Sequence, residues 1–168
     1  MLVEEGSLET AEGSEMLDDA IRSSGTSWIP PTEESWWIYE RLGRIVERAN
    51  AHYEFDLTGF VEDLQFTVYD EVGSFYTWHQ DGLDGTVAGR KLSIVIQLSD
   101  PADYEGGRLE FFDVASDLDD DEYDEFCEAS GRQGTAIVFP SFEYHQVQAL
   151  TAGLRYSLVA WISGPPFR

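Results

Sequence analysis

From Leu64 to the end of the chain, apolar and polar residues alternate with a period of two, and this pattern strongly constrains the fold. Successive side chains of a strand point to opposite faces of a sheet, so the alternation predicts short, half-buried strands. Seven segments rich in β-branched and aromatic residues follow the pattern: LQFTVYD, FYTWHQD, KLSIVIQLS, RLEFF, GTAIVF, HQVQAL and LRYSLVAWIS. The sequence therefore predicts a mainly β protein built as a sandwich, jelly roll or barrel.

One amphipathic helix precedes these strands. Its apolar residues recur at helical spacing, at Ile38, Leu42, Ile45, Val46 and Ala49. Thr32 can act as the N-cap, and Glu33 and Glu34 then fall in the first turn, where the helix dipole favours acidic residues. We therefore expect a helix over residues 33–51 with its apolar face against the sheet.

The length of 168 residues suits a single domain with one hydrophobic core, and we assign residues 25–168 to it. Residues 1–24 are rich in Glu, Gly and Ser, which predicts a loosely ordered acidic arm with a short helix over residues 15–22. Residues 113–129 interrupt the strands with nine acidic residues, including the run Asp119-Asp120-Asp121-Glu122. This composition favours a solvated acidic loop.

The charge balance limits the classes of partner. The chain has 33 acidic and 10 basic residues and a formal net charge of −23, so its field repels phosphate backbones and anionic lipid surfaces. We expect neither nucleic acid nor a membrane as a partner. The sequence also lacks a long apolar run and the basic start of a secretory signal, which predicts a cytoplasmic location. A single cysteine, Cys127, excludes an internal disulfide.

Two histidines and one aspartate in the predicted strands form a candidate metal site. His79 and Asp81 are two residues apart, so in a strand their side chains lie on the same face. His145 opens a later strand. Two imidazoles and one carboxylate form the facial set typical of Fe(II), with three coordination positions left open. Three protein ligands also suit a catalytic Zn²⁺.

An arginine lies ten residues after the second of these histidines, on an otherwise apolar strand. Alternation places Arg155 and Ser157 on one face of that strand. A buried guanidinium is costly without a carboxylate partner, so Arg155 either pairs with an internal acid or binds the carboxylate of a ligand. We favour the ligand, because a planar guanidinium can hold a carboxylate through two parallel hydrogen bonds. Tyr69 and Gln97 can assist if their strand faces line the cavity.

The order of these motifs resembles that of the 2-oxoglutarate- and Fe(II)-dependent dioxygenases, and within them the prolyl 4-hydroxylase-like branch. The motifs are Tyr69, Tyr76, His79-x-Asp81, Gly106-Gly107-x-Leu109, Gly134-Thr135, Phe139-Pro140-Ser141, His145 and Arg155-x-Ser157. The similarity covers about residues 22–165. It implies a double-stranded β-helix, which is the jelly roll of cupin-like proteins, with a supporting N-terminal α-helix.

The resemblance also implies roles for individual residues. His79, Asp81 and His145 would hold Fe(II). The residues implied for the co-substrate 2-oxoglutarate are Arg155, Tyr69, Gln97, Ser157 and Val147. The candidates for the substrate side are Tyr76, Trp78, Arg90 and Trp161.

The activity implied is hydroxylation of a C–H bond with O2, with release of succinate and CO2 and with ascorbate as a candidate reductant. The substrate would be a peptidyl or protein side chain, with proline as one candidate, or a free amino acid. Two alternatives remain at this point: a non-oxygenase, metal-binding cupin-like protein that holds zinc or nickel, and a ligand-binding barrel with no functional metal. The sequence leaves the oligomeric state open.

Overall fold

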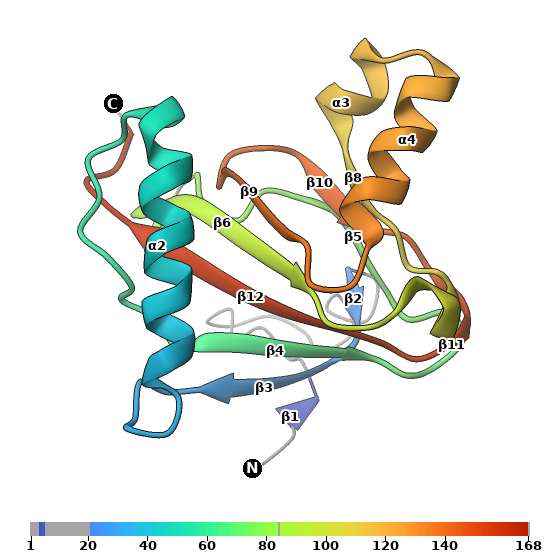
Figure 1. Ribbon diagram of the computed structural model, residues 1–168, viewed down its shortest axis with the longest axis horizontal. Coiled ribbons are helices and arrows are strands. Elements are labelled where there is room, and N and C mark those ends of the chain that lie inside the picture. The colour runs from blue at the N-terminus through green and yellow to red at the C-terminus, as the bar shows by residue number, and fades with distance from the viewer. Residues whose placement is uncertain (1–3, 6–20, 84, 168) are drawn as a thin grey trace.

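The computed structural model describes residues 4–5, 21–83 and 85–167 (Figure 1). Most of the expected short helix over residues 15–22 lies outside these ranges, and its last residue, Arg22, belongs to a strand instead. In the part of the chain that the structure describes, no helix is both long and apolar enough to cross a bilayer.

Two antiparallel sheets form the body of the molecule, and the fold is the predicted mainly β jelly roll. The large sheet has the strand order β1 (Glu4–Glu5), β3 (Gly25–Ile29), β4 (Leu64–Tyr69), β12 (Arg155–Ser163), β6 (Arg90–Gln97) and β9 (Ala136–Pro140). The small sheet has the order β2 (Arg22–Ser23), β5 (Phe75–His79), β10 (His145–Val147) and β8 (Leu109–Phe111). Strands β7 (Tyr104–Gly106) and β11 (Leu150–Gly153) form a separate pair.

The prediction of seven strand segments is confirmed, because each of them contains at least one strand of the structure. Three strands on the N-terminal side, β1, β2 and β3, were not predicted. β3 pairs with β4 and, on its other side, with β1 in the large sheet, and β2 pairs with β5, Arg22 lying opposite Tyr76. Residues 22–23, which the sequence assigned to the acidic arm, are thus part of the small sheet.

The two faces of the large sheet differ in chemistry. Helix α2 (Trp36–Tyr53) covers the outer face (Figure 1). The buried residues of this layer are Tyr39, Leu42, Val46, Leu64, Leu92, Ile94, Leu158, Ala160 and Ile162. The buried polar residues of the inner face include Gln65, Thr67, Ser93, Gln97, Arg155 and Ser157. Strand alternation thus supplies an apolar face for the core and a polar face for the interior of the jelly roll.

Helix α2 begins three residues later than its sequence pattern predicted. Ser35, and not Thr32, occupies the N-cap position, and Ser35 makes no side-chain cap hydrogen bond to the helix. The two residues instead bond to each other: Thr32 N–H donates to Ser35 Oγ at 2.8 Å. Glu33 and Glu34 therefore lie in a turn before the helix and not in its first turn.

The expected acidic loop over residues 113–129 is wrong, because this segment is mostly helical. It contains most of α3 (Phe112–Asp117) and of α4 (Asp120–Gly131), which project together beside β8 (Figure 1). Asp119 and Glu122 form a capping box at the start of α4. The acidic run is therefore a helix start, where the dipole favours carboxylates. Phe126 of α4 packs against Phe111 in the interior.

We predict that Leu42→Ala lowers the free energy of unfolding by about 2–5 kcal/mol, because Leu42 is only 1% exposed within the layer between α2 and the sheet. Urea denaturation followed by circular dichroism measures the change. The matched control is Trp37→Ala on the same helix, where the side chain is 58% exposed and the expected loss is below about 1 kcal/mol. Equal losses in the two variants would mean that α2 does not stabilise the sheet.

Candidate metal and co-substrate site

Two candidate metal ligands lie opposite one another on neighbouring strands of the small sheet. β5 and β10 run antiparallel, with His145 paired to His79 and Val147 paired to Tyr76. A step of two residues along β10 therefore matches a step of three residues along β5, which is a β-bulge. The imidazole centroids of the two histidines are 4.2 Å apart. One strand pair thus joins two ligands that are far apart in the sequence.

The third candidate, Asp81, follows β5 and is fixed by contacts from other segments. Its backbone N–H donates to the carbonyl of Ser141 at 2.9 Å, and the Ser93 hydroxyl donates to its Oδ2 at 2.6 Å. The carboxylate faces both imidazoles: Oδ1 lies 3.4 Å from His79 Nε2, and Oδ2 lies 3.7 Å from His145 Nε2. Only 7% of Asp81 is exposed.

Backbone carbonyls set the tautomer of both imidazoles. Nδ1 of His79 lies 2.7 Å from the carbonyl oxygen of Thr77, and Nδ1 of His145 lies 2.8 Å from that of Glu143. A carbonyl oxygen can only accept, so each Nδ1 carries the donated proton. Each Nε2 then keeps a lone pair directed at the carboxylate, which is the arrangement that metal-binding histidines use.

The electrostatics of the cluster favour a charged aspartate and a neutral histidine. Burial by itself raises the pKa of Asp81, but the two imidazoles that face the carboxylate and the hydroxyl of Ser93 together hold that pKa well below its usual range. Burial lowers the pKa of His145, although the neighbouring Asp81 charge opposes the shift. An anionic carboxylate and neutral imidazoles are the forms that bind a divalent metal.

Within the described ranges, His79, Asp81 and His145 are the one group of at least three potential metal ligands, and their ligand atoms all lie within 4.8 Å of one another. Their two nitrogens and one oxygen fit one face of an Fe(II) coordination octahedron. The structure thus brings together the three residues that the sequence singled out for the metal.

The surroundings of Arg155 indicate that a second ligand binds in the interior in addition to the metal. It is 1% exposed, and its Nη2 donates to Gln97 Oε1 at 2.8 Å. Its guanidinium carbon lies 5.0 Å from the ring centroid of Tyr69. Nε and Nη1 are fully enclosed and have no hydrogen-bond partner in the structure. Because an unpaired buried donor is costly, two such atoms on one guanidinium fit an acceptor that arrives with a ligand, such as a carboxylate.

The other residues expected around the co-substrate lie on the same inner faces. Ser157 is 2% exposed and pairs with Gln97 across β12 and β6, while Val147 packs in the interior apolar cluster with Tyr69. Gly107 makes room for the arginine. A Cβ at this position would lie 3.1 Å from Cδ of Arg155, and the positive φ of 60° also suits glycine.

Of the four expected substrate-side residues, Tyr76 contacts the metal-binding cluster directly, and Trp161 pairs across β12 and β6 with Ser93, which bonds to Asp81. Tyr76 stacks on His79 with ring centroids 3.5 Å apart and an interplanar angle of 15°. Burial and the nearby charge of Asp81 raise the pKa of Tyr76 to about 12, so the phenol stays protonated. Trp161 is 6% exposed, and its Nε1 is enclosed without a hydrogen-bond partner in the structure. An enclosed donor of this kind is available to a ligand.

The other two expected substrate residues make contacts outside the three clustered side chains. Trp78 contacts the exposed rings of Phe112 and Tyr144 rather than the metal-binding cluster, because neighbouring residues of a strand point to opposite faces and His79 points inward. Arg90 is engaged by Glu62, to which its Nε donates at 2.8 Å, and its Nη1 donates to the carbonyl of Asp81 at 3.1 Å. Arg90 is thus a support for the metal ligand.

Sequence reasoning did not find Ser93 and Arg22 as site residues. Ser93 shared a strand face with other polar residues, but nothing in the sequence pointed to its bond with Asp81. Arg22 was assigned to the acidic arm, and its burial depends on the pairing of the short strand β2.

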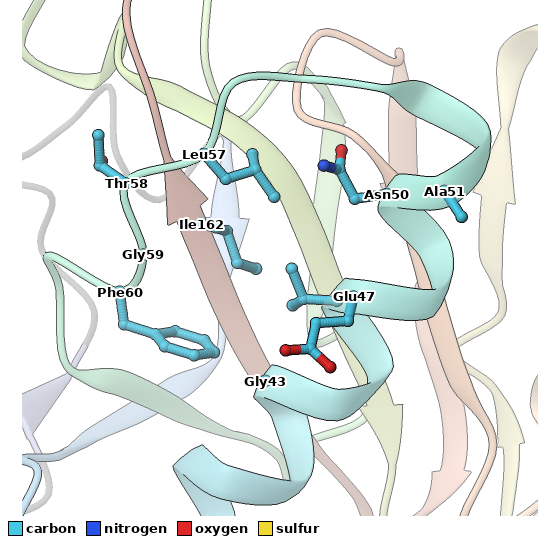
Figure 2. Close-up of a pocket in the computed structure, with 10 residues that line it drawn as sticks. Gly43, Glu47, Asn50, Ala51, Leu57, Thr58, Gly59, Phe60 and Ile162 are labelled. Atoms are coloured by element: carbon cyan, nitrogen blue, oxygen red, sulfur yellow. The ribbon is translucent and has the colours of Figure 1, made fainter.

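A separate hollow of about 650 Å³ lies on the opposite face of the large sheet, between α2 and residues 57–60. Figure 2 shows Ile162 of β12 on its floor and Glu47 of α2 at its side. Ile162 belongs to the outer apolar layer, so this hollow is not part of the metal-binding cluster.

We predict that His145→Ala removes high-affinity Fe(II) binding, because two protein ligands hold the metal weakly. Ser93→Ala should weaken binding about ten- to a hundred-fold, because Asp81 loses the hydroxyl that orients it. Anaerobic titration with Fe(II) and quantification of bound metal measure both effects. His52→Ala is the control, since this third histidine lies on α2 outside the cluster. Unchanged Fe(II) affinity in His145→Ala would contradict the assignment.

The sequence matches a known protein family and resembles curated proteins. A sequence model described as the 2OG-Fe(II) oxygenase superfamily matches residues 64–163. A PKHD-type hydroxylase of Synechococcus sp. (strain CC9902) is 36% identical over 92 residues, which cover 55% of this chain and 37% of that protein. A PKHD-type hydroxylase of Sphingopyxis alaskensis is 35% identical over 133 residues, with coverages of 74% and 56%. The chain thus spans roughly half or less of these curated relatives.

Solved structures show the same fold. A Pseudomonas putida prolyl-4-hydroxylase aligns with a TM-score of 0.64 and 23% identity, covering 87% of this chain and 74% of that one. A Trichoplax adhaerens prolyl hydroxylase in complex with a hypoxia inducible factor peptide fragment aligns with a TM-score of 0.67 and 18% identity, covering 96% and 70%. The family match covers more than half of the chain and includes the three clustered ligands and Arg155, so the chain belongs to the 2OG-Fe(II) oxygenase superfamily.

Proposed function

We propose that the protein is an Fe(II)- and 2-oxoglutarate-dependent dioxygenase that hydroxylates a C–H bond of a peptidyl or protein side chain, with proline as the first candidate. The observation that carries this proposal is the enclosed guanidinium of Arg155. Two of its nitrogens have no hydrogen-bond acceptor among the described residues, and the guanidinium lies in the same interior as the metal-ligand cluster. A metal-binding protein that takes no organic co-substrate would not require a buried guanidinium with unpaired donors. This argues against the non-oxygenase cupin-like alternative.

When bound, Fe(II) with 2-oxoglutarate and O2 would supply the oxidising chemistry, with release of succinate and CO2. His79, Asp81 and His145 would hold the metal on one face and leave the other positions for the co-substrate and O2. Arg155 would hold the distal carboxylate of 2-oxoglutarate, with Gln97 keeping the guanidinium in place. Positioning of this kind is the contribution of the protein itself.

The substrate class is inferred from the relatives. The curated relatives are named PKHD-type hydroxylases, and the two solved neighbours described above are prolyl hydroxylases, one of them bound to a peptide. A peptidyl substrate also fits the aromatic side chains near the cluster, Tyr76 and Trp161. A free amino acid is the alternative substrate, ascorbate remains the candidate reductant, and the cytoplasmic location stays a prediction.

The reaction is tested by measuring succinate from 2-oxoglutarate with the Fe(II)-loaded protein when O2 is admitted. Mass spectrometry of proline-containing peptides in the same mixture shows whether one oxygen atom is gained. Succinate that forms only with Fe(II) and O2 supports the proposal. Stoichiometric Fe(II) binding with no succinate under any of these conditions would favour the non-oxygenase alternative.

We predict that Arg155→Lys raises the KM for 2-oxoglutarate about ten- to a hundred-fold, because lysine provides a point charge in place of a planar fork. Steady-state succinate formation at varied 2-oxoglutarate measures the KM. Fe(II) affinity serves as the internal control and should stay within about twofold, since no ligand of the cluster is changed. An unchanged KM would mean that 2-oxoglutarate is anchored elsewhere.

A further inference from the structure

Two arginines are buried among the residues that the structure describes, and the site described above uses only one of them. Arg155 is 1% exposed and Arg22 is 9% exposed. The chain has 33 acidic and only 10 basic residues, so carboxylate partners are abundant. Nevertheless, neither arginine has a carboxylate within 4.0 Å among the described residues, whereas the part-buried Arg90 pairs with Glu62.

The surroundings of the two buried arginines are alike. A glutamine from a neighbouring strand accepts from each guanidinium: Gln97 from Arg155 Nη2 at 2.8 Å, and Gln65 from Arg22 Nη2 at 3.1 Å. A tyrosine ring also lies against each. The guanidinium carbon of Arg22 is 4.9 Å from the ring centroid of Tyr76, close to the 5.0 Å between Arg155 and its own tyrosine. Both arginines thus have neutral partners in the interior of the jelly roll.

Arg22 lies on the metal side of this interior. Its ring partner, Tyr76, stacks directly on His79, so one aromatic ring separates the guanidinium from a metal-ligand imidazole. From β2 in the small sheet, Arg22 reaches across to Gln65 and Thr67 on the inner face of the large sheet. Its Nε donates to Ser24 Oγ at 2.7 Å. Nη1 makes no hydrogen bond to any described residue and, unlike Nε and Nη1 of Arg155, is not fully enclosed, which leaves a solvent-accessible donor for a ligand.

Burial of a guanidinium with only neutral partners carries a large desolvation cost. A ligand carboxylate would remove this cost, because it completes the charge pair and accepts two parallel hydrogen bonds. The co-substrate does not meet this need, since its distal carboxylate is the partner proposed for Arg155. The acceptor for Arg22 must therefore come with the other molecule that enters the site.

We propose that Arg22 is a second carboxylate-binding site and that it receives an acidic group of the substrate, next to the residue that is hydroxylated. This inference rests on the proposed function and narrows its substrate class to acid-bearing molecules: a free or C-terminal proline, or a prolyl peptide with a neighbouring Asp or Glu. The net charge of −23 disfavours anions at long range, so the selectivity comes from the local pairing.

The test measures binding to the protein loaded anaerobically with Fe(II) and 2-oxoglutarate, so that Arg155 is occupied and no turnover takes place. Isothermal titration compares three matched pairs of acid and neutral amide: N-acetylproline with N-acetylprolinamide, acetyl-Pro-Glu-amide with acetyl-Pro-Gln-amide, and acetyl-Glu-Pro-amide with acetyl-Gln-Pro-amide. We expect the acid to bind at least about tenfold more tightly in at least one pair. Equal affinity, or no measurable binding, in all three pairs would overturn the proposal.

Two variants separate a local contact from the overall field. Arg22→Gln should abolish the preference for the acid. Arg41→Gln removes the same charge from an exposed arginine on α2, where the side chain also lies over a tryptophan ring, and should keep the preference. If Arg22→Gln does not fold, Arg22→Lys keeps the charge without the fork and should reduce the preference. A preference that survives in a folded Arg22 variant at wild-type strength would assign Arg22 to structural support alone.

Failure of the proposed function is distinguishable from failure of this inference. Succinate formation by the wild-type protein tests the oxygenase reaction and does not depend on Arg22. If the wild-type protein forms no succinate but shows an acid preference that Arg22→Gln abolishes, the carboxylate site at Arg22 is supported and the oxygenase reaction is rejected. If the wild-type protein forms succinate but shows no acid preference, the oxygenase reaction is supported and the carboxylate site is rejected.

Discussion

The buried carboxylate of Asp81 is the charge on which the rest of the site depends. A carboxylate that is only 7% exposed requires partners, and here they come from separate parts of the chain: imidazoles from β5 and β10, and a hydroxyl from Ser93 on β6. The backbone of Asp81 is held by the carbonyl of Ser141, after β9. Satisfying this one charge therefore ties the small sheet to the large one at the position where the metal ligands meet.

The two faces of the large sheet have different functions. Leucine, isoleucine and alanine on the outer face pack under α2 and supply hydrophobic stabilisation. The inner face buries arginine, glutamine, serine and threonine, which contribute less to stability than apolar residues of the same volume. Polar groups held in an interior at such a cost are typical of a binding site. The division between a stabilising face and a binding face follows directly from the two-residue period of the strands.

The sequence was sufficient to predict the strands and the metal-ligand residues because both depend on local periodicity. His79 and Asp81 are two residues apart, and Arg155 and Ser157 share a strand face for the same reason. Predictions failed where structure depends on non-local pairing or on a break in the period. β2 and β3 are too short or too irregular to show alternation, and the ion pair of Arg90 with Glu62 joins residues from different segments.

The acidic helices and the bulge in β5 show two further limits of sequence reasoning. The run from Asp119 to Glu122 has the composition of a solvated loop, but acidic residues are equally suited to the first turn of a helix, and composition does not distinguish the two. Trp78 was placed near the metal ligands because it is next to His79 in the sequence. Neighbouring residues of a strand point to opposite faces, so Trp78 faces outward where His79 faces inward. The extra residue in β5 instead brings Tyr76 to the side of His79, and no sequence pattern indicates such a bulge.

That extra residue also determines how freely one metal ligand can move. In a regular strand, Tyr76 and His79 would point to opposite faces, since they are three positions apart. The bulge turns both rings inward, where they stack at 3.5 Å. With the phenol ring against one side and the Thr77 carbonyl holding Nδ1, the imidazole of His79 has little torsional freedom left to lose when a metal binds. A local irregularity of the backbone thus lowers the entropic cost of coordination and makes this ligand rigid before the metal arrives.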